Sequence, residues 1–148
     1  METFQEFSKI VVLRLPSLYG AGQSDSFIDG LAQPALRGEP LELFSGGQLV
    51  RDTLHVNDVV NGIAACIDQQ PKSAFSTMNL GCGRPIKTLE YAKALVEALG
   101  SDSKIIPVER KSSYFDLYAD IETARSQIGF EPMPLEQSMK IYADELRA

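Results

Sequence analysis

The sequence is poor in the residues that build metal sites and disulfides. It has two cysteines, no CxxC pair and a single histidine. A structural zinc site takes four cysteine or histidine ligands, usually in closely spaced pairs, so no metal site is expected. Cys66 falls in a helical pattern and Cys82 in a Gly-Cys-Gly turn. We expect both to be free thiols in a reducing cytoplasm.

Basic clusters and long apolar runs are also missing. Fourteen Lys and Arg against twenty Asp and Glu give a formal net charge of -6, and no basic cluster could follow a phosphate backbone. No apolar run approaches the roughly 20 residues of a membrane-spanning helix. We therefore expect neither nucleic acid nor a membrane as partner, and the length predicts a single domain over residues 1–148.

Residues that could carry out a bond-breaking step are few. No tyrosine is followed four residues later by a lysine, the pair that lets a phenolate act as a base near neutral pH. The turns at 20–22 and 81–83 both lack the third glycine of the dinucleotide fingerprint, and we interpret 81–83 as a structural turn. A structural role is favoured for His55 over a catalytic one. No residue is assigned to catalysis.

One apolar stretch near the N-terminus predicts a buried strand. Four consecutive aliphatic residues, 10–13, are typical of a parallel strand covered on both faces in an α/β protein. For Arg14, within this strand, a buried ion pair is favoured over a binding contact. Residues 16–25 follow as a loop at the strand's carboxyl end, where open α/β sheets place their ligands.

Caps and periodicity predict the other elements. Ser26 begins a helix through a capping box, Gly38 ends it, and Pro34 is expected to kink or split it. Asn57 and Thr88 are expected to cap two later helices. Further strands are predicted at 74–80 and 105–108, and further helices at 58–69, 88–99, 121–128 and 135–146.

The stretch 41–58 combines a glycine turn, one cation and a helix start. Alternating apolar residues on both sides of Ser45-Gly46-Gly47 predict two short strands joined as a hairpin. Arg51 would project from the second strand, where a guanidinium can hold a phosphate through two parallel hydrogen bonds. The alternative is an internal ion pair with Asp52 or Asp58. Pattern alone leaves both open.

Four segments of the chain together resemble one family. Their order and spacing are similar to the C-terminal half of the extended short-chain dehydrogenases/reductases, the NAD(P)-dependent epimerases and dehydratases that act largely on nucleotide sugars. The resemblance covers about residues 9 to 146. The segments are Leu13–Gly20, Gly46–Asp58, Met78–Gly83 and Ala119–Pro132.

The resemblance implies an α/β fold: the C-terminal part of a Rossmann-like enzyme, with a small substrate-binding subdomain and one or two parallel strands of the cofactor sheet. The family's glycine fingerprint, catalytic Ser/Thr and Tyr-x-x-x-Lys pair lie upstream of the strand at 10–15. We therefore expect a chain that is inactive alone, with NAD or NADP bound only in the complete protein. The strand would expose apolar surface and an edge, which predicts a homo-oligomer. The alternative is a non-catalytic binding or interaction module.

The resemblance also assigns site residues. The arginine matching Arg51 binds substrate phosphates in the family, and Arg110, followed by Lys111 in the loop 110–116, falls near a second phosphate-binding arginine. Residues matching Leu43 and Phe44 commonly line the pocket for the nucleotide base.

Two further positions match the segment that passes the nicotinamide and the sugar. Pro16 is assigned to the cofactor and Ser17 to the substrate. Ser17 replaces the usual asparagine and Ala21 the usual proline, which affects sugar specificity.

Overall fold

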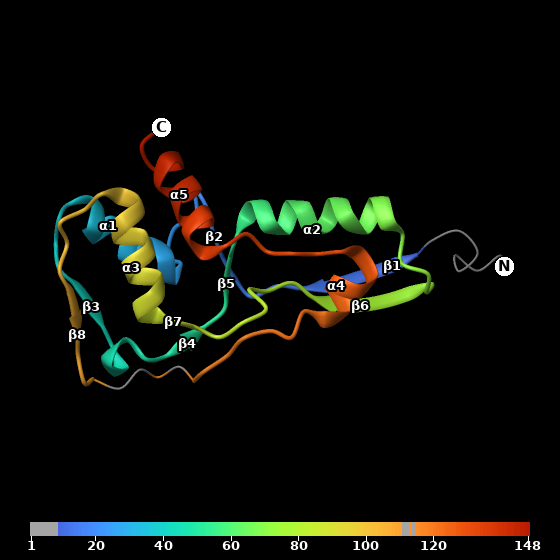
Figure 1. Ribbon diagram of the computed structural model, residues 1–148, viewed down its shortest axis with the longest axis horizontal. Coiled ribbons are helices and arrows are strands. Elements are labelled where there is room, and N and C mark those ends of the chain that lie inside the picture. The colour runs from blue at the N-terminus through green and yellow to red at the C-terminus, as the bar shows by residue number, and fades with distance from the viewer. Residues whose placement is uncertain (1–8, 111–112, 114) are drawn as a thin grey trace.

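The computed structural model describes residues 9–110, 113 and 115–148 of the protein, and Figure 1 shows their arrangement. The strands in this part of the chain are β1 (Ile10–Arg14), β2 (Ser17–Tyr19), β3 (Leu41–Leu43), β4 (Val50–Arg51), β5 (Thr53–His55), β6 (Phe75–Asn79), β7 (Ile86–Lys87) and β8 (Ile105–Pro107). The helices are α1 (Phe27–Leu36), α2 (Val56–Gln69), α3 (Thr88–Leu99), α4 (Glu122–Ile128) and α5 (Leu135–Glu145), with a 3-10 turn, η2, at Ser45–Gly47.

The strands pair mainly in parallel. β1 pairs with β6, β2 with β5 and β3 with β8, all parallel, while β4 and β7 form a short antiparallel pair. Parallel strands need long crossover connections, and helices contribute to them here: α1, for example, lies in the connection between the paired strands β2 and β5. The predicted α/β class with parallel strands is confirmed.

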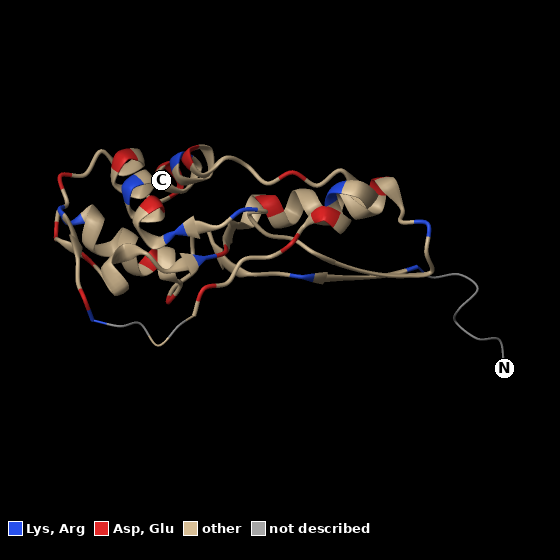
Figure 2. Cartoon of the chain, turned by 60° about the horizontal axis from the view of Figure 1, so that its bottom comes forward, with Lys and Arg blue, Asp and Glu red and all other residues tan. Residues whose placement is uncertain are grey.

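The described part of the chain contains two separate hydrophobic cores. The first lies among α1, α3, α5 and β3, and the second among β5, β6, α2 and α4. Figure 1 shows these two groups at opposite ends of an elongated molecule, and the half-buried Cys82 packs against both cores. Figure 2 shows acidic and basic residues interspersed along the described chain.

Strand β1 is covered on one face only. Val11 and Leu13 pack against the second core, whereas Ile10 and Val12 on the other face are 55% and 40% exposed. Among the described residues β1 pairs with β6 alone, so its other edge is open. The prediction of burial on both faces therefore holds for one face. Arg14 is exposed, and the predicted buried ion pair at this position is wrong.

The predicted hairpin at 41–56 is wrong as well. Two glycines with positive φ, Gly46 (61°) and Gly47 (73°), do turn the chain in η2. However, β3, which precedes the turn, pairs with β8, in the register Leu41 opposite Ile105 and Leu43 opposite Pro107, and β4, which follows the turn, pairs with β7. The turn separates two strands that have different partners, because each finds a longer-range neighbour.

Helix starts agree with the sequence at one site and differ at two. Ser26 caps α1 as predicted, its side chain accepting a hydrogen bond from the N–H of Asp29 at 3.0 Å. Helix α2 is capped by His55 rather than by Asn57, and α3 begins after Lys87 rather than after Thr88. Helix α1 also continues through Pro34 and ends two residues later, so the predicted interruption is wrong.

Candidate functional site

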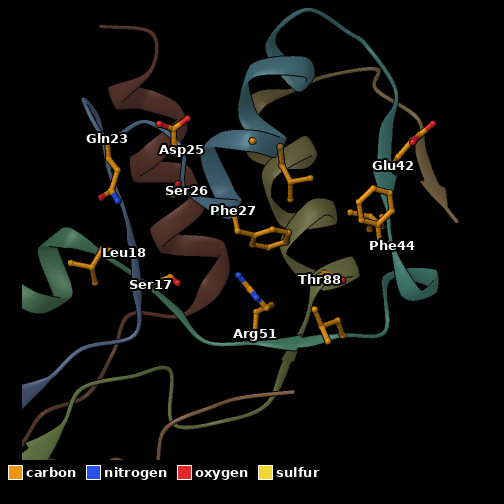
Figure 3. A pocket seen from close by; sticks show the side chains of 14 residues that line it. Ser17, Leu18, Gln23, Asp25, Ser26, Phe27, Glu42, Phe44, Arg51 and Thr88 are labelled. Atoms are coloured by element: carbon orange, nitrogen blue, oxygen red, sulfur yellow. The ribbon is translucent and has the colours of Figure 1, made fainter. Parts of the chain in front are cut away.

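A cavity of about 630 Å³ lies between β2, the N-terminal end of α1 and the segment from β3 to β4. This volume is in the range of small-molecule pockets, about 300–1,000 Å³. Ser17, Leu43, Phe44 and Arg51, four of the five residues predicted to bind substrate, line it together (Figure 3). The rest of the lining consists of Leu18, Gln23, Asp25, Ser26, Phe27, Gly30, Leu31, Glu42, Leu49 and Thr88.

Arg51 reaches the cavity from β4, where it pairs with Ile86 of β7. Its guanidinium carbon lies 5.6 Å from the centre of the Phe27 ring, and that ring in turn packs edge-to-face against Tyr91, with 6.0 Å between centroids. Stacking uses the flat face of a guanidinium, whereas its N–H donors lie in the plane. In Figure 3 the side chain extends toward Phe27 from the floor of the cavity.

The two carboxylates considered as internal partners of this arginine both accept hydrogen bonds from backbone N–H groups. Asp52 is buried, and its two oxygens accept from Cys82 at 2.9 Å and from Ala119 at 2.7 Å. Asp58 is buried and accepts from Met133 at 2.9 Å. Burial raises the pKa of Asp58 above its usual value, and the hydrogen bond from the Met133 N–H offsets only part of this rise. The two hydrogen bonds of Asp52 link the end of β4, which carries Arg51, to the segments at Cys82 and Ala119.

Gly81 is the residue that makes this tie possible. A Cβ at this position would lie 2.5 Å from an Asp52 carboxylate oxygen and 2.8 Å from the Cβ of Ala119. Any side chain would therefore displace the carboxylate from the two N–H groups. This close approach gives the glycine a structural reason, in agreement with the interpretation of 81–83 as a structural turn.

Tyr91 anchors the same strand from α3. It is fully buried, and its hydroxyl accepts from the N–H of Thr53 at 3.3 Å and donates to the carbonyl of Arg51 at 3.4 Å. Burial raises its pKa, and burial also raises the pKa of the neighbouring Cys82 thiol to about 12. Both groups stay protonated near neutral pH. Cys82 and Cys66 are free cysteines, as predicted, and Cys82 is not an activated nucleophile.

The other two predicted site residues lie next to the cavity rather than in its lining. The guanidinium carbon of Arg110 is 5.2 Å from the centre of the Phe44 ring, so this cation lies at the rim beyond Phe44. Its carbonyl accepts from the N–H of Ser45 at 2.9 Å. Pro16 is half-buried between β1 and β2. Lys111 lies outside the described residues.

Several lining residues were not predicted from the sequence. Phe27 directly follows the helix cap at Ser26, and this position was the available signal for it. Thr88 is buried, and in the described chain its hydroxyl oxygen has no hydrogen-bond partner. Gln23 and Asp25 come from the segment 16–25, which was predicted only as a loop and candidate site; its residues Ser17–Tyr19 form β2 instead of loop.

His55 occupies a structural position, in agreement with the favoured interpretation. It is fully buried, its Nδ1 accepts from the N–H of Asn57 at 3.2 Å, and its Nε2 lies 3.2 Å from a carboxylate oxygen of Glu145. The acceptor role of Nδ1 assigns the proton to Nε2, which then donates to Glu145. The ring packs edge-to-face on Tyr19, whose hydroxyl donates to Ser138 at 2.8 Å.

The described ranges, 9–110, 113 and 115–148, contain no candidate metal site and no candidate membrane-spanning helix. Within them no three His, Cys, Asp or Glu side chains form a group that could hold a metal ion. No helix of this part of the chain is both long and apolar enough to cross a membrane.

Comparison with known proteins decides the family. The model of the NAD dependent epimerase/dehydratase family matches residues 2–81, more than half of the chain. The chain belongs to this family. The predicted resemblance to part of an extended short-chain dehydrogenase/reductase is thereby confirmed.

Curated relatives of this epimerase/dehydratase family member include enzymes of UDP-sugars. UDP-glucuronic acid decarboxylase 1 of Xenopus tropicalis is 29% identical over 114 residues, covering 71% of the chain and 25% of that protein. UDP-glucuronate 4-epimerase 5 of Arabidopsis thaliana is 25% identical over 146 residues, covering 86% of the chain and 34% of that protein.

Solved structures show the same Rossmann-like fold. The UDP-glucose 4-epimerase of Thermotoga maritima, in complex with UDP-glucose, is 27% identical with a TM-score of 0.74, and the match covers 93% of the chain and 45% of that structure. MoeE5, in complex with UDP-glucuronic acid and NAD, is 27% identical with a TM-score of 0.76, covering 94% of the chain and 47% of that structure. The chain thus spans about half the length of these structures and less of the two curated relatives.

Proposed function

We propose that the 148 residues form the nucleotide-sugar-binding portion of an NAD(P)-dependent epimerase/dehydratase-type oxidoreductase of the cytoplasm. The observation that carries the proposal is the cavity itself. In Figure 3 Arg51 lies between Ser17 on one side and Phe44, with Glu42, on the other, and Leu43 lines the same cavity. A nucleotide sugar has the matching order of groups: a flat base, a charged diphosphate and a hydroxylated ring.

The position of β1 indicates how the ligand would be oriented in the cavity. Ligands of open α/β sheets bind at the carboxyl ends of the strands, and Pro16 and Ser17 lie just beyond the carboxyl end of β1. We therefore assign the sugar to the end at Ser17 and the base to the end at Phe44. Arg51 would hold the diphosphate between them, and Arg110 would add a second positive charge at the rim.

The cofactor would meet this chain at one edge only. NAD(P) supplies a hydride acceptor and donor when bound. Pro16, half-buried at the carboxyl end of β1, fits the edge of such a site, but the 148 residues contain neither the glycine fingerprint nor the Tyr-x-x-x-Lys pair. We propose that the isolated chain binds the substrate without transforming it, and that a dinucleotide-binding portion is needed for activity.

The test is calorimetric titration of the 148-residue chain with UDP, UDP-glucose and free glucose. We expect UDP and UDP-glucose to bind and free glucose not to bind, because the diphosphate and the base supply most of the contacts. No change of the sugar, followed by NMR, is expected with NAD present. Failure of UDP to bind would overturn the proposal. Binding together with turnover would overturn only the inactivity of the chain.

We further propose that the open edge of β1 joins two copies of the chain. The strand presents unpaired backbone groups beside the exposed Ile10 and Val12. We expect a dimer in sedimentation of the wild-type chain and a monomer for Val12→Lys, because a charge on an edge strand opposes pairing. Val60→Lys, on the exposed face of α2, should leave the dimer intact. A wild-type monomer would contradict the proposal.

A further inference from the structure

Aromatic rings from two helices contact the main chain and the guanidinium of the arginine in the cavity. The guanidinium carbon of Arg51 lies 5.6 Å from the centre of the ring of Phe27, the first residue of α1, and Figure 3 shows the two side chains facing each other. The Phe27 ring packs edge-to-face on Tyr91 of α3, with 6.0 Å between centroids and 85° between the ring planes. The Tyr91 hydroxyl in turn donates to the carbonyl of Arg51 at 3.4 Å. These contacts form a closed circuit that runs from the backbone of the arginine through two rings to its guanidinium.

The ring of Phe27 rests on a rigid neighbour. Tyr91 is fully buried in the first hydrophobic core, and its hydroxyl also accepts from the N–H of Thr53 at 3.3 Å. Phe27 is half-buried, packs against the same core and lines the cavity. The cap at Ser26 fixes the start of its helix. Because close packing restricts a side chain to few rotamers, Phe27 presents one defined ring face to the arginine.

The contact with Phe27 is compatible with phosphate binding by the same guanidinium. An aromatic face attracts a cation, and it restricts the orientation of a planar one. The N–H donors of a guanidinium lie in its plane, so a ring against its face leaves them in a geometry that suits two phosphate oxygens. A long side chain that is already oriented loses less rotamer freedom when its ligand binds.

We infer that Phe27 is a positioning residue for Arg51. This inference rests on the proposed function, in which Arg51 holds the diphosphate. Phe27 acts on UDP through the guanidinium, and an aliphatic side chain at this position would fill the space without offering an aromatic face. The alternative is that Phe27 is only an apolar wall of the cavity, and the two roles give different results when Arg51 is absent.

A double-mutant cycle separates these roles, with UDP titrated into the wild-type chain, Phe27→Leu, Arg51→Ala and the double variant. With Arg51 present, Phe27→Leu should weaken UDP binding about threefold to fivefold, as expected for a partly exposed cation–π contact. In the Arg51→Ala background the same substitution should change it by less than about 1.5-fold, because no guanidinium is left to position. Phe27→Tyr keeps an aromatic face and should bind UDP within about twofold of the wild type. NMR titration measures the weaker affinities. Circular dichroism checks the fold of each variant, and Phe27→Met replaces Phe27→Leu if leucine unfolds the chain.

Phe44→Leu is the matched control, because it removes an aromatic ring from the lining at the end assigned to the base. It should weaken UDP binding by the same factor with and without Arg51. An equal loss from Phe27→Leu in both backgrounds, or no loss in the wild-type background, would overturn the inference, while UDP binding that Arg51→Ala weakens would still support the proposed function. Failure of the wild-type chain to bind UDP would overturn both.

Discussion

Replacement of Arg51 by alanine is expected to weaken UDP binding on the order of 100-fold, or about 2–3 kcal/mol. The guanidinium is the only cation in the described lining of the cavity, and its carbon lies 5.6 Å from the centre of the Phe27 ring. Its loss removes the charge-assisted hydrogen bonds to the diphosphate. Arg51→Lys should lose about tenfold, because an ammonium keeps the charge but not the two parallel bonds. Calorimetric titration with UDP measures both.

Two other arginines calibrate this result. Arg110→Ala should weaken UDP binding by about threefold, since this cation lies at the rim and is exposed. Arg84→Ala should have no effect, because Arg84 is exposed, faces Glu90 and lies outside the lining. Far-ultraviolet circular dichroism of each variant checks that the fold is kept. If the alanine variants at 51 and 84 bound UDP equally well, the phosphate role of Arg51 would be wrong.

The site could be predicted from the sequence to the extent that it depends on local order along the chain. Ser17 follows an aliphatic strand, and Arg51 follows a glycine turn and precedes a helix. Such patterns place a residue at the end of an element, and ends of neighbouring elements converge in α/β folds. The resemblance added Ser17, Leu43 and Phe44 and favoured phosphate binding by Arg51, and the structure brings all four to one cavity.

The pairing of strands could not be predicted in the same way. β3 has only three residues, and its partner β8 begins 62 positions after its last residue, at Ile105. A glycine turn followed by alternating apolar residues is typical of a hairpin, and only the tertiary packing of α1 and α3 places β8 beside β3. Caps failed for a similar reason, since the imidazole of His55 caps α2 from its position in the core.

Arg14 and Phe27 show that the sequence of one helix or strand does not determine which of its faces is buried. That depends on the segments that pack against it. The apolar run at 10–13 predicts a covered strand, yet the exposure of Arg14 depends on which segments lie against β1. Phe27 is one of several apolar residues in α1. Its role under the guanidinium of Arg51 follows from the approach of β4 to this helix, which no periodicity encodes.

Replacement of Asp52 by alanine is expected to lower the free energy of unfolding by about 3–5 kcal/mol, the largest loss of stability that we predict for a single site. The carboxylate is 7% exposed and accepts from two backbone N–H groups, those of Cys82 and Ala119. Alanine would leave both donors without a partner in the interior. Asp52→Asn should lose most of the same stability, because an amide has one oxygen acceptor and turns its NH₂ toward the second donor. Denaturant unfolding followed by circular dichroism gives the values.

Asp116→Ala provides the matched control. Its carboxylate also accepts a backbone N–H, that of Val50 at 2.8 Å, but it is exposed, so water can replace it and we expect a loss below about 1 kcal/mol. Similar losses at both positions would show that burial of the Asp52 carboxylate is not what stabilises the chain. Because Asp52 adjoins Arg51, its removal also frees the strand that holds the guanidinium. In the destabilised variant we therefore expect UDP affinity to fall even at temperatures where circular dichroism shows a fully folded chain, and to fall less in Asp116→Ala, whose exposed carboxylate holds the same strand through one hydrogen bond.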